Sequence, residues 1–222
     1  MAQTVIFDLD GTLADTSGDL IAAANACFRS MGEEDQLHHE HDAGTALRGG
    51  RAMLTLGFER LGRGGDTALV DSYYKPLLDH YETAIDTHTR FYPGALEAAA
   101  LLRAEGWKLA VCTNKPEYLA HLLLSRMGVL DVFDALVGAD TLPVRKPDPE
   151  PLREAARRAG GDPARAVMVG DTITDHATAR AAGVPSILVS FGPGGEDVAA
   201  LEPDAILASF EDLPGLLRQV IG

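Results

Sequence analysis

The sequence predicts an α/β protein built on a parallel β-sheet, and three observations support this fold class. Short runs of β-type residues alternate with longer amphipathic runs along most of the 222 residues. Alanine runs such as residues 98–100 favour a chain rich in helix. A glycine follows each of four helical runs, at positions 106, 128, 160 and 183, where helix C-terminal caps are common. We therefore expect helices on both faces of a parallel sheet.

The expected elements follow one another in a regular order. Runs of β-type residues cover positions 4–7, 109–112, 135–137, 166–169 and 186–189. Helical patterns cover positions 96–105, 118–127, 151–159 and 175–182. Most of these helices fall between two strands, as the crossovers of a parallel sheet require.

One long stretch interrupts the alternation. Residues 16–90 read as several helices without a convincing strand, with a histidine-rich patch at 36–42 and glycine-rich turns at 49–50 and 62–65. The gap of about 75 residues after the first strand is far longer than an ordinary crossover. We therefore expect an α/β core domain at 1–15 and 91–222, and a helical domain inserted at 16–90.

Composition and charge exclude several classes of partner. The formal net charge is -14 and the pI is near 4.8, so we expect no binding to nucleic acid or to anionic membrane surfaces. No apolar run is long enough to span a bilayer, and the N-terminus lacks the basic leader of a signal peptide. Cys27 and Cys112 are expected to be buried free thiols. These features predict a cytoplasmic globular protein.

Polar residues stand at four predicted strand ends, where open α/β sheets bind their ligands. The first strand ends in Asp8-Leu9-Asp10-Gly11-Thr12, and the next in Thr113-Asn114-Lys115. The third signal is the loop around Lys146, and the fourth is Asp171 with Asp175 one helical turn later. Each signal alone also fits an ordinary turn or helix cap. Together they predict a single acidic site with two lysines beside it.

Carboxylates that converge in this way repel one another unless a cation lies between them. Their hard oxygen atoms suit Mg²⁺, and the lysines suit a phosphoryl group. Asp8 is then placed to attack phosphorus and form an aspartyl-phosphate. Asp10 is placed to protonate the leaving oxygen and later to deprotonate the attacking water.

With these four signals in this order, the sequence resembles the haloacid dehalogenase superfamily. Within that superfamily it is most similar to the phosphoglycolate phosphatases, through Thr113-Asn114-Lys115-Pro116, Tyr92-Pro93-Gly94 and Lys146-Pro147-Asp148-Pro149. The resemblance covers nearly the whole chain. It implies a Rossmann-like parallel-sheet core with an inserted α-helical cap, and a Mg²⁺-dependent phosphomonoesterase whose best candidate substrate is 2-phosphoglycolate.

The resemblance also implies a role for each matching residue. Asp8 matches the nucleophile and a Mg²⁺ ligand, and Asp10 matches the acid/base, with its backbone carbonyl as second ligand. Asp171 matches the third ligand, and Asp175 an acidic residue that supports the ion. The residues that match the binding of the phosphoryl group are Thr113, Asn114 and Lys146.

The inserted domain gives weaker signals. Arg48 is our candidate for contacting a substrate carboxylate, with Arg51 as the runner-up. The histidines at 38, 39 and 41 are expected in a flexible exposed loop and not in a metal cluster, and His176 is expected to face solvent.

Other functions stay open at this point, among them a phosphatase of another small phosphoester or of pyrophosphate. A β-phosphoglucomutase-like mutase usually has Glu where this chain has Gly170. A true dehalogenase needs no acid at the position of Asp10. A non-catalytic phosphate-sensing module needs only about half of this chain. For the partners we expect a small phosphoester, acted on by a monomer or a homodimer.

Overall fold

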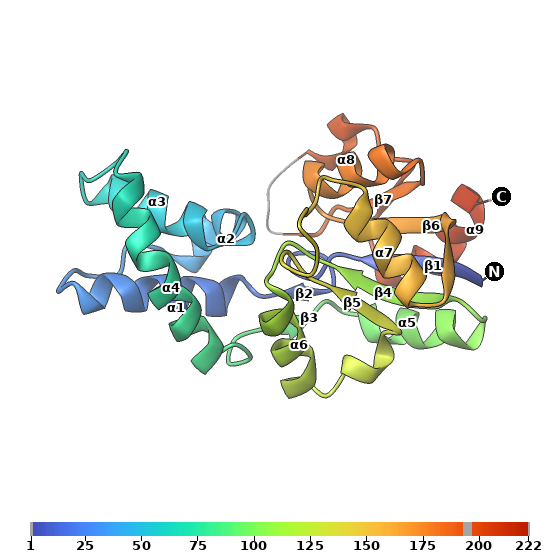
Figure 1. The fold of residues 1–222 in the computed structure, drawn as a ribbon, viewed down its shortest axis with the longest axis horizontal. Coiled ribbons are helices and arrows are strands. Elements are labelled where there is room, and N and C mark those ends of the chain that lie inside the picture. The colour runs from blue at the N-terminus through green and yellow to red at the C-terminus, as the bar shows by residue number, and fades with distance from the viewer. Residues whose placement is uncertain (1, 193–196, 222) are drawn as a thin grey trace. The chain divides into compact units, whose positions relative to one another are not determined.

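The computed structural model describes residues 2–192 and 197–221, and the chain divides into two compact units. Met1–Ala14 and Phe91–Gly222 form one unit, and Asp15–Arg90 form the other. The chain passes from one unit to the other at two short strands, β2 (Ala14–Asp15) and β3 (Arg90–Phe91), which pair in a small sheet (Figure 1). In the part of the chain that is described, no helix is both long and apolar enough to cross a membrane.

The first unit is built on a six-stranded sheet. Its strands are β1 (Ala2–Phe7), β4 (Lys108–Cys112), β5 (Ala135–Val137), β6 (Gly161–Gly170), β7 (Ser186–Val189) and β8 (Ala205–Leu207). All neighbouring strands are parallel, in the order β5-β4-β1-β6-β7-β8. The predicted α/β class with a parallel sheet is therefore confirmed. β1 lies between β4 and β6, so the strand order reverses beside its carboxyl end, where ligands bind in such sheets.

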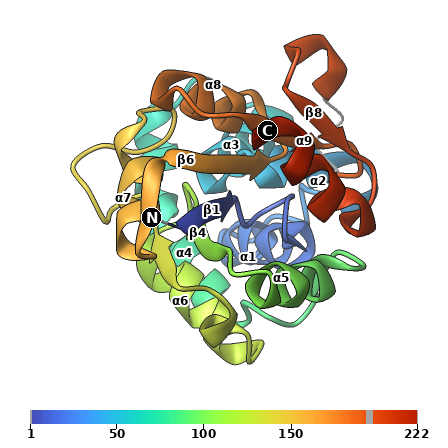
Figure 2. The same cartoon turned by 90° about the vertical axis from the view of Figure 1, so that its right-hand side faces the viewer.

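Helices cover both faces of this sheet (Figure 2). They are α5 (Ala95–Ala104), α6 (Glu117–Arg126), α7 (Glu150–Arg158), α8 (Ile173–Ala182) and α9 (Leu213–Ile221). Small side chains of α7 and α8, such as Ala155 and Ala179, pack with Ile6, Ala110 and Met168 in one buried cluster. α5 and α9 contact one another and the strands β4, β6 and β8. Short 3-10 turns lie at Leu130–Val132, Val198–Leu201 and Phe210–Asp212.

The second unit is helical. It contains α1 (Ser17–Ser30), α2 (His39–Leu47), α3 (Gly50–Arg60) and α4 (Thr67–Thr83). Its core includes the buried Phe28 and Phe58, whose ring centroids are 5.4 Å apart. The half-buried ring of Tyr73 packs on Phe58 with centroids 5.8 Å apart, and both pairs meet edge to face. A Cβ atom at Gly57 would come within 2.1 Å of the Phe28 ring, so glycine lets α1 and α3 approach closely.

Two expectations about histidines need correction. The histidines at 38, 39 and 41 are exposed as expected, but the segment 36–42 is not a loop throughout: α2 begins within it, and the buried Asp42 accepts two hydrogen bonds of 2.7 Å from Arg60. His176 does not face solvent. It is 5% exposed, and its Nδ1 atom lies 2.9 Å from the hydroxyl of Ser186. The expectation for the cysteines is confirmed, because Cys27 and Cys112 are buried and unpaired.

Candidate active site

Asp8 is the first residue after β1 and lies at the carboxyl edge of the sheet. Its backbone N–H still donates to the carbonyl of Val169 on β6, at 2.9 Å, so the strand pairing fixes its position. The chain then turns sharply, with Gly11 in the left-handed region at φ +84° and its N–H bonded to the carbonyl of Ala14. This turn presents Asp8 and Asp10 at the same edge.

Lys146 connects Asp8, after β1, to Asp175 on α8. Its ammonium lies 3.0 Å from the Oδ1 atom of Asp8 and 2.6 Å from the Oδ1 atom of Asp175, and the residue is only 3% exposed. Burial alone would lower the pKa of Lys146, but the carboxylates of Asp175 and Asp8 outweigh burial and raise it. The ammonium therefore stays charged. The amide of Asn114 donates to the carbonyl of Lys146 at 3.1 Å, and the peptide bond between Lys146 and Pro147 is cis.

The turn between β6 and α8 holds the remaining acidic residues. The Oδ1 atom of Asp171 accepts a 2.9 Å hydrogen bond from the hydroxyl of Thr12. The Oδ2 atom of Asp175 accepts from the hydroxyl of Thr172 at 2.7 Å and from its N–H at 3.1 Å, which completes a capping box at the start of α8. Asp175 is thus a helix cap and a partner of Lys146 at once, so both of its oxygens are in use.

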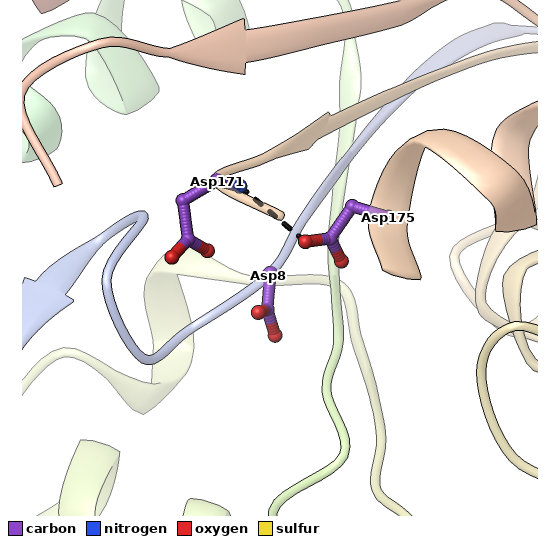
Figure 3. Close-up of side chains that lie close together, drawn as sticks. All are labelled: Asp8, Asp171 and Asp175. Atoms are coloured by element: carbon purple, nitrogen blue, oxygen red, sulfur yellow. Dashed lines mark hydrogen bonds between the residues drawn. The ribbon is translucent and has the colours of Figure 1, made fainter. Parts of the chain in front are cut away.

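Three carboxylates at this edge form a candidate metal site. One oxygen from each of Asp8, Asp171 and Asp175 lies within 4.8 Å of the other two, and the three side chains lie close together in Figure 3. The Oδ2 atom of Asp171 is buried and has no hydrogen-bond partner in the structure as described. A hard oxygen atom with nothing to bind, beside two more carboxylates, suits a hard divalent cation. The residues present therefore fit the ion that this donor set implies.

The charge balance of the site points in the same direction. Burial raises the pKa of Asp8 to about 6, with Asp175 and Asp10 adding to the rise and Lys146 opposing it. Burial, followed by the charges of Asp175 and Asp8, also raises the pKa of Asp171 well above its ordinary value. Four carboxylates face two ammonium groups here, an excess of two negative charges that one divalent cation would balance.

The loop after β4 brings three more predicted residues to this edge. Thr113 is buried, and its hydroxyl oxygen accepts the N–H of Lys115 at 3.2 Å, so its O–H remains able to donate to a ligand. The side chain of Asn114 supports the Lys146 loop, as described above. The ammonium of Lys115 lies 2.8 Å from the Oδ1 atom of Asp10.

The two candidate arginines belong to the helical unit. Arg48 is exposed at the end of α2, and its guanidinium donates to the hydroxyl of Thr45 at 2.9 Å. Arg51 is paired with Asp71 and lies over the ring of Tyr74, with 4.6 Å between the guanidinium carbon and the ring centroid. The prediction that Arg48 contacts substrate remains a prediction.

Sequence reasoning missed three contacts around the site. The hydrogen bond from Thr12 to Asp171 joins residues 159 positions apart, and neither residue type indicates that it forms. The pair of Lys115 and Asp10 was missed because a lysine beside Thr113 suggested a phosphate donor. The capping role of Asp175 had a signal, since a threonine three positions before an acidic residue is typical of a capping box.

This chain is similar to known proteins in sequence and in fold. Residues 2–183 match the family model of the haloacid dehalogenase-like hydrolases. A phosphoglycolate phosphatase of Mesorhizobium japonicum is 41% identical over 212 residues, covering 94% of this chain and 92% of that protein. Another, of Rhodospirillum rubrum, is 40% identical over 97% of this chain and 90% of that protein. The solved structure of a predicted phosphoglycolate phosphatase from Haemophilus somnus has the same fold, with a TM-score of 0.84, 23% identity and 97% coverage of each chain.

Proposed function

The chain belongs to the haloacid dehalogenase-like hydrolase family, and from this premise we propose that it is a phosphomonoesterase that works through an aspartyl-phosphate on Asp8. One observation carries the proposal. A buried carboxylate at the end of β1 lies 3.0 Å from a buried ammonium and beside two further carboxylates. Such an arrangement holds a negatively charged nucleophile and a phosphoryl group together in one site.

The proposed reaction has two displacements at phosphorus. A carboxylate oxygen of Asp8 attacks phosphorus, and the bond to the ester oxygen breaks with its electron pair remaining on that oxygen. Asp10 gives this oxygen a proton, and the alcohol leaves. Water then attacks the same phosphorus and loses its proton to Asp10, while the bond to Asp8 breaks and restores its carboxylate. The products are one alcohol and inorganic phosphate.

The basic and polar residues have separate tasks in this scheme. Lys146 keeps Asp8 ionised and neutralises oxygens of the phosphoryl group, and the hydroxyl of Thr113 donates to one of them. Asn114 supports this arrangement through the carbonyl of Lys146. Asp175 holds Lys146 in place through its 2.6 Å hydrogen bond.

Asp8, Asp171 and the backbone carbonyl of Asp10 are the proposed ligands of a Mg²⁺ ion, with Asp175 supporting them. When bound, the ion would neutralise charge between the anionic nucleophile and the anionic ester. The buried free oxygen of Asp171 supports this assignment. The occupied oxygens of Asp175 favour a supporting role for that residue over direct ligation.

We propose 2-phosphoglycolate as the substrate and the helical unit as the cap that selects it. The substrate rests on the named activity of the relatives that are 41% and 40% identical over most of the chain. A mutase that acts on sugar phosphates is less well supported. A Cβ atom at Gly170 would come within 2.2 Å of the Cβ atom of Asp175, so the acidic residue usual in those mutases has no room here.

The test is phosphate release from a panel of esters, each measured with Mg²⁺ and with EDTA. The panel holds 2-phosphoglycolate, 3-phosphoglycerate, sugar phosphates, pyrophosphate and p-nitrophenyl phosphate. We expect Mg²⁺-dependent release, with kcat/KM for 2-phosphoglycolate at least about tenfold above the others, or ~1.4 kcal/mol of discrimination. A preference for another ester would overturn the substrate and leave the mechanism standing.

Asp8→Asn separates the covalent mechanism from simpler hydrolysis. The variant should fold and lose turnover on every ester, because an amide is no nucleophile here. Asp131→Asn, at an exposed aspartate of the same unit, is the matched control and should keep full activity. Near-normal turnover by Asp8→Asn would exclude covalent catalysis at that residue.

A further inference from the structure

Lys115 is a buried ammonium to which the proposed reaction gives no task. The chain has four lysines, and two of them, Lys75 and Lys108, form ion pairs on the surface. Lys115 and Lys146 are instead only 7% and 3% exposed. Because an ammonium is costly to bury unless an anion faces it, the partner of Lys115 indicates what it does.

The two buried lysines contact different carboxylates of the site. Lys146 contacts Asp8 and Asp175, at 3.0 Å and 2.6 Å. The Nζ atom of Lys115 lies 2.8 Å from the Oδ1 atom of Asp10, and these two side chains are 4% and 15% exposed. One lysine thus serves the nucleophile and the other serves the acid/base.

The backbone that carries Lys115 is fixed on both sides. Its N–H donates to the hydroxyl of Thr113 at 3.2 Å, and its carbonyl accepts the N–H of Ala139 at 2.9 Å. Pro116 follows and restricts the next backbone torsion. Asp10, in contrast, lies in the turn between β1 and β2, outside the six-stranded sheet. A fixed ammonium 2.8 Å from the carboxylate of Asp10 can therefore hold that side chain in one orientation.

We infer that Lys115 positions the carboxylate of Asp10 for proton transfer and does not bind the phosphoryl group. The inference rests on the proposed function, which gives Asp10 both proton transfers. The same carboxylate must reach the leaving oxygen in the first displacement and the water in the second, so a single held orientation serves both. Small errors in the placement of such a group reduce the rate strongly.

The leaving group of the substrate distinguishes the two roles. An alkyl ester such as 2-phosphoglycolate needs a proton on its leaving oxygen, whereas p-nitrophenol leaves as a stable phenolate. Because kcat/KM covers the first displacement, a positioning role predicts a selective loss. Lys115→Met should lower kcat/KM for 2-phosphoglycolate by about tenfold or more. For p-nitrophenyl phosphate the loss should stay below about threefold, and inhibition by inorganic phosphate should be unchanged.

Four further variants complete the experiment. Asp10→Asn should show the same selective loss. Adding Lys115→Met to Asp10→Asn should lower kcat/KM little further, because both changes disable the same proton transfer. Lys115→Arg should recover part of the activity on the alkyl ester. Lys108→Met, at a surface ion pair of the same unit, should behave as the wild type. Melting temperatures establish that each variant is folded.

Three outcomes would overturn the inference. Equal losses on both esters with weaker inhibition by phosphate would make Lys115 a phosphate-binding residue. Additive losses with Asp10→Asn would indicate a role independent of Asp10, and no loss on either ester would remove any role. If the wild type releases phosphate from no ester, the proposed function has failed. If Asp10→Asn is selective but Lys115→Met is not, only the inference about Lys115 has failed.

Discussion

Asp8 is a carboxyl group whose burial opposes its ionisation. Burial raises its pKa to about 6, from an ordinary value of 3.8. At pH values between 3.8 and about 6, Asp8 binds more protons in the folded state than in the unfolded state. The free energy of unfolding therefore falls as the pH rises through this range. A difference of about two in pKa corresponds to roughly 3 kcal/mol. Asp171, whose pKa is also raised, acts in the same direction.

The prediction concerns the difference between the wild type and Asp8→Asn, which removes the titrating group. In EDTA, the variant should gain roughly 2–3 kcal/mol of stability relative to the wild type as the pH rises from about 4 to about 7. Urea unfolding at a series of pH values measures this. Adding Mg²⁺ at neutral pH should stabilise the wild type and not the variant. Parallel pH profiles for the two proteins would contradict the prediction.

Individual residues could be predicted as far as their position at a strand end determines their environment. Asp8, Lys146, Asp171 and Asp175 were expected at one edge because the carboxyl ends of parallel strands meet there, and the structure brings them together. Side-chain pairing could not be predicted in the same way. Whether Lys115 faces a phosphate or Asp10 depends on rotamers and loop geometry that spacing does not encode.

The turn between β6 and α8 shows how one element sets the geometry of the site. Gly170 ends β6, and a Cβ atom there would come within 2.2 Å of the Cβ atom of Asp175. Any side chain at this position must therefore push α8 away from the sheet or rotate Asp175 off Lys146. The glycine is required by this contact and not by its own backbone conformation.

Gly170→Ala should destabilise the protein by about 1–3 kcal/mol and reduce kcat/KM, since overpacking here also displaces Asp175. Gly215→Ala is the matched control. Gly215 lies inside α9, and a Cβ atom added there would meet nothing within 4 Å, so alanine should stabilise by about 0.5–1 kcal/mol. Urea unfolding and kinetics on both variants check this. A neutral Gly170→Ala with normal kinetics would show that the turn tolerates a side chain.

Elements with a strong local pattern were predictable and weakly patterned ones were not. The expected strands 135–137 and 186–189 coincide with β5 and β7. β6 begins at Gly161, earlier than expected, because its first residues are a polar extension that pairs with the start of β1. β8 and α9 were missed. β8 is only three residues long, and it is a strand only because β7 pairs with it.

At the scale of the whole molecule, the residues proposed for catalysis and those proposed for substrate selection belong to different units. Every contact described between the acidic residues and the two buried lysines lies within the α/β unit. The helical unit contributes none of these residues. The long gap after the first strand predicts an insertion, because no crossover of a parallel sheet needs about 75 residues. How the inserted unit would select a substrate depends on its side chains, and its exposed arginines are the candidates for contacting a substrate carboxylate.

Arg48 and Arg51 differ in the partners that their guanidinium groups already contact. Arg51 has an ion pair with Asp71 and a tyrosine ring beneath its guanidinium, so its charge has partners within its own unit. Arg48 is exposed, and the structure describes only its bond to the hydroxyl of Thr45. A guanidinium bound to a neutral hydroxyl has more to gain from a substrate carboxylate than one already paired with an aspartate.

Arg48→Ala should therefore raise KM for 2-phosphoglycolate by about tenfold, the loss of one charge-assisted hydrogen bond, and leave kcat nearly unchanged. KM for p-nitrophenyl phosphate, which has no carboxylate, should change by less than about twofold. Steady-state kinetics on both esters measure the contrast, with Arg63→Ala, at another exposed arginine of the same unit, as control. Equal changes on the two esters would remove the assigned role, and selectivity for the carboxylate would then have to arise elsewhere in the helical unit.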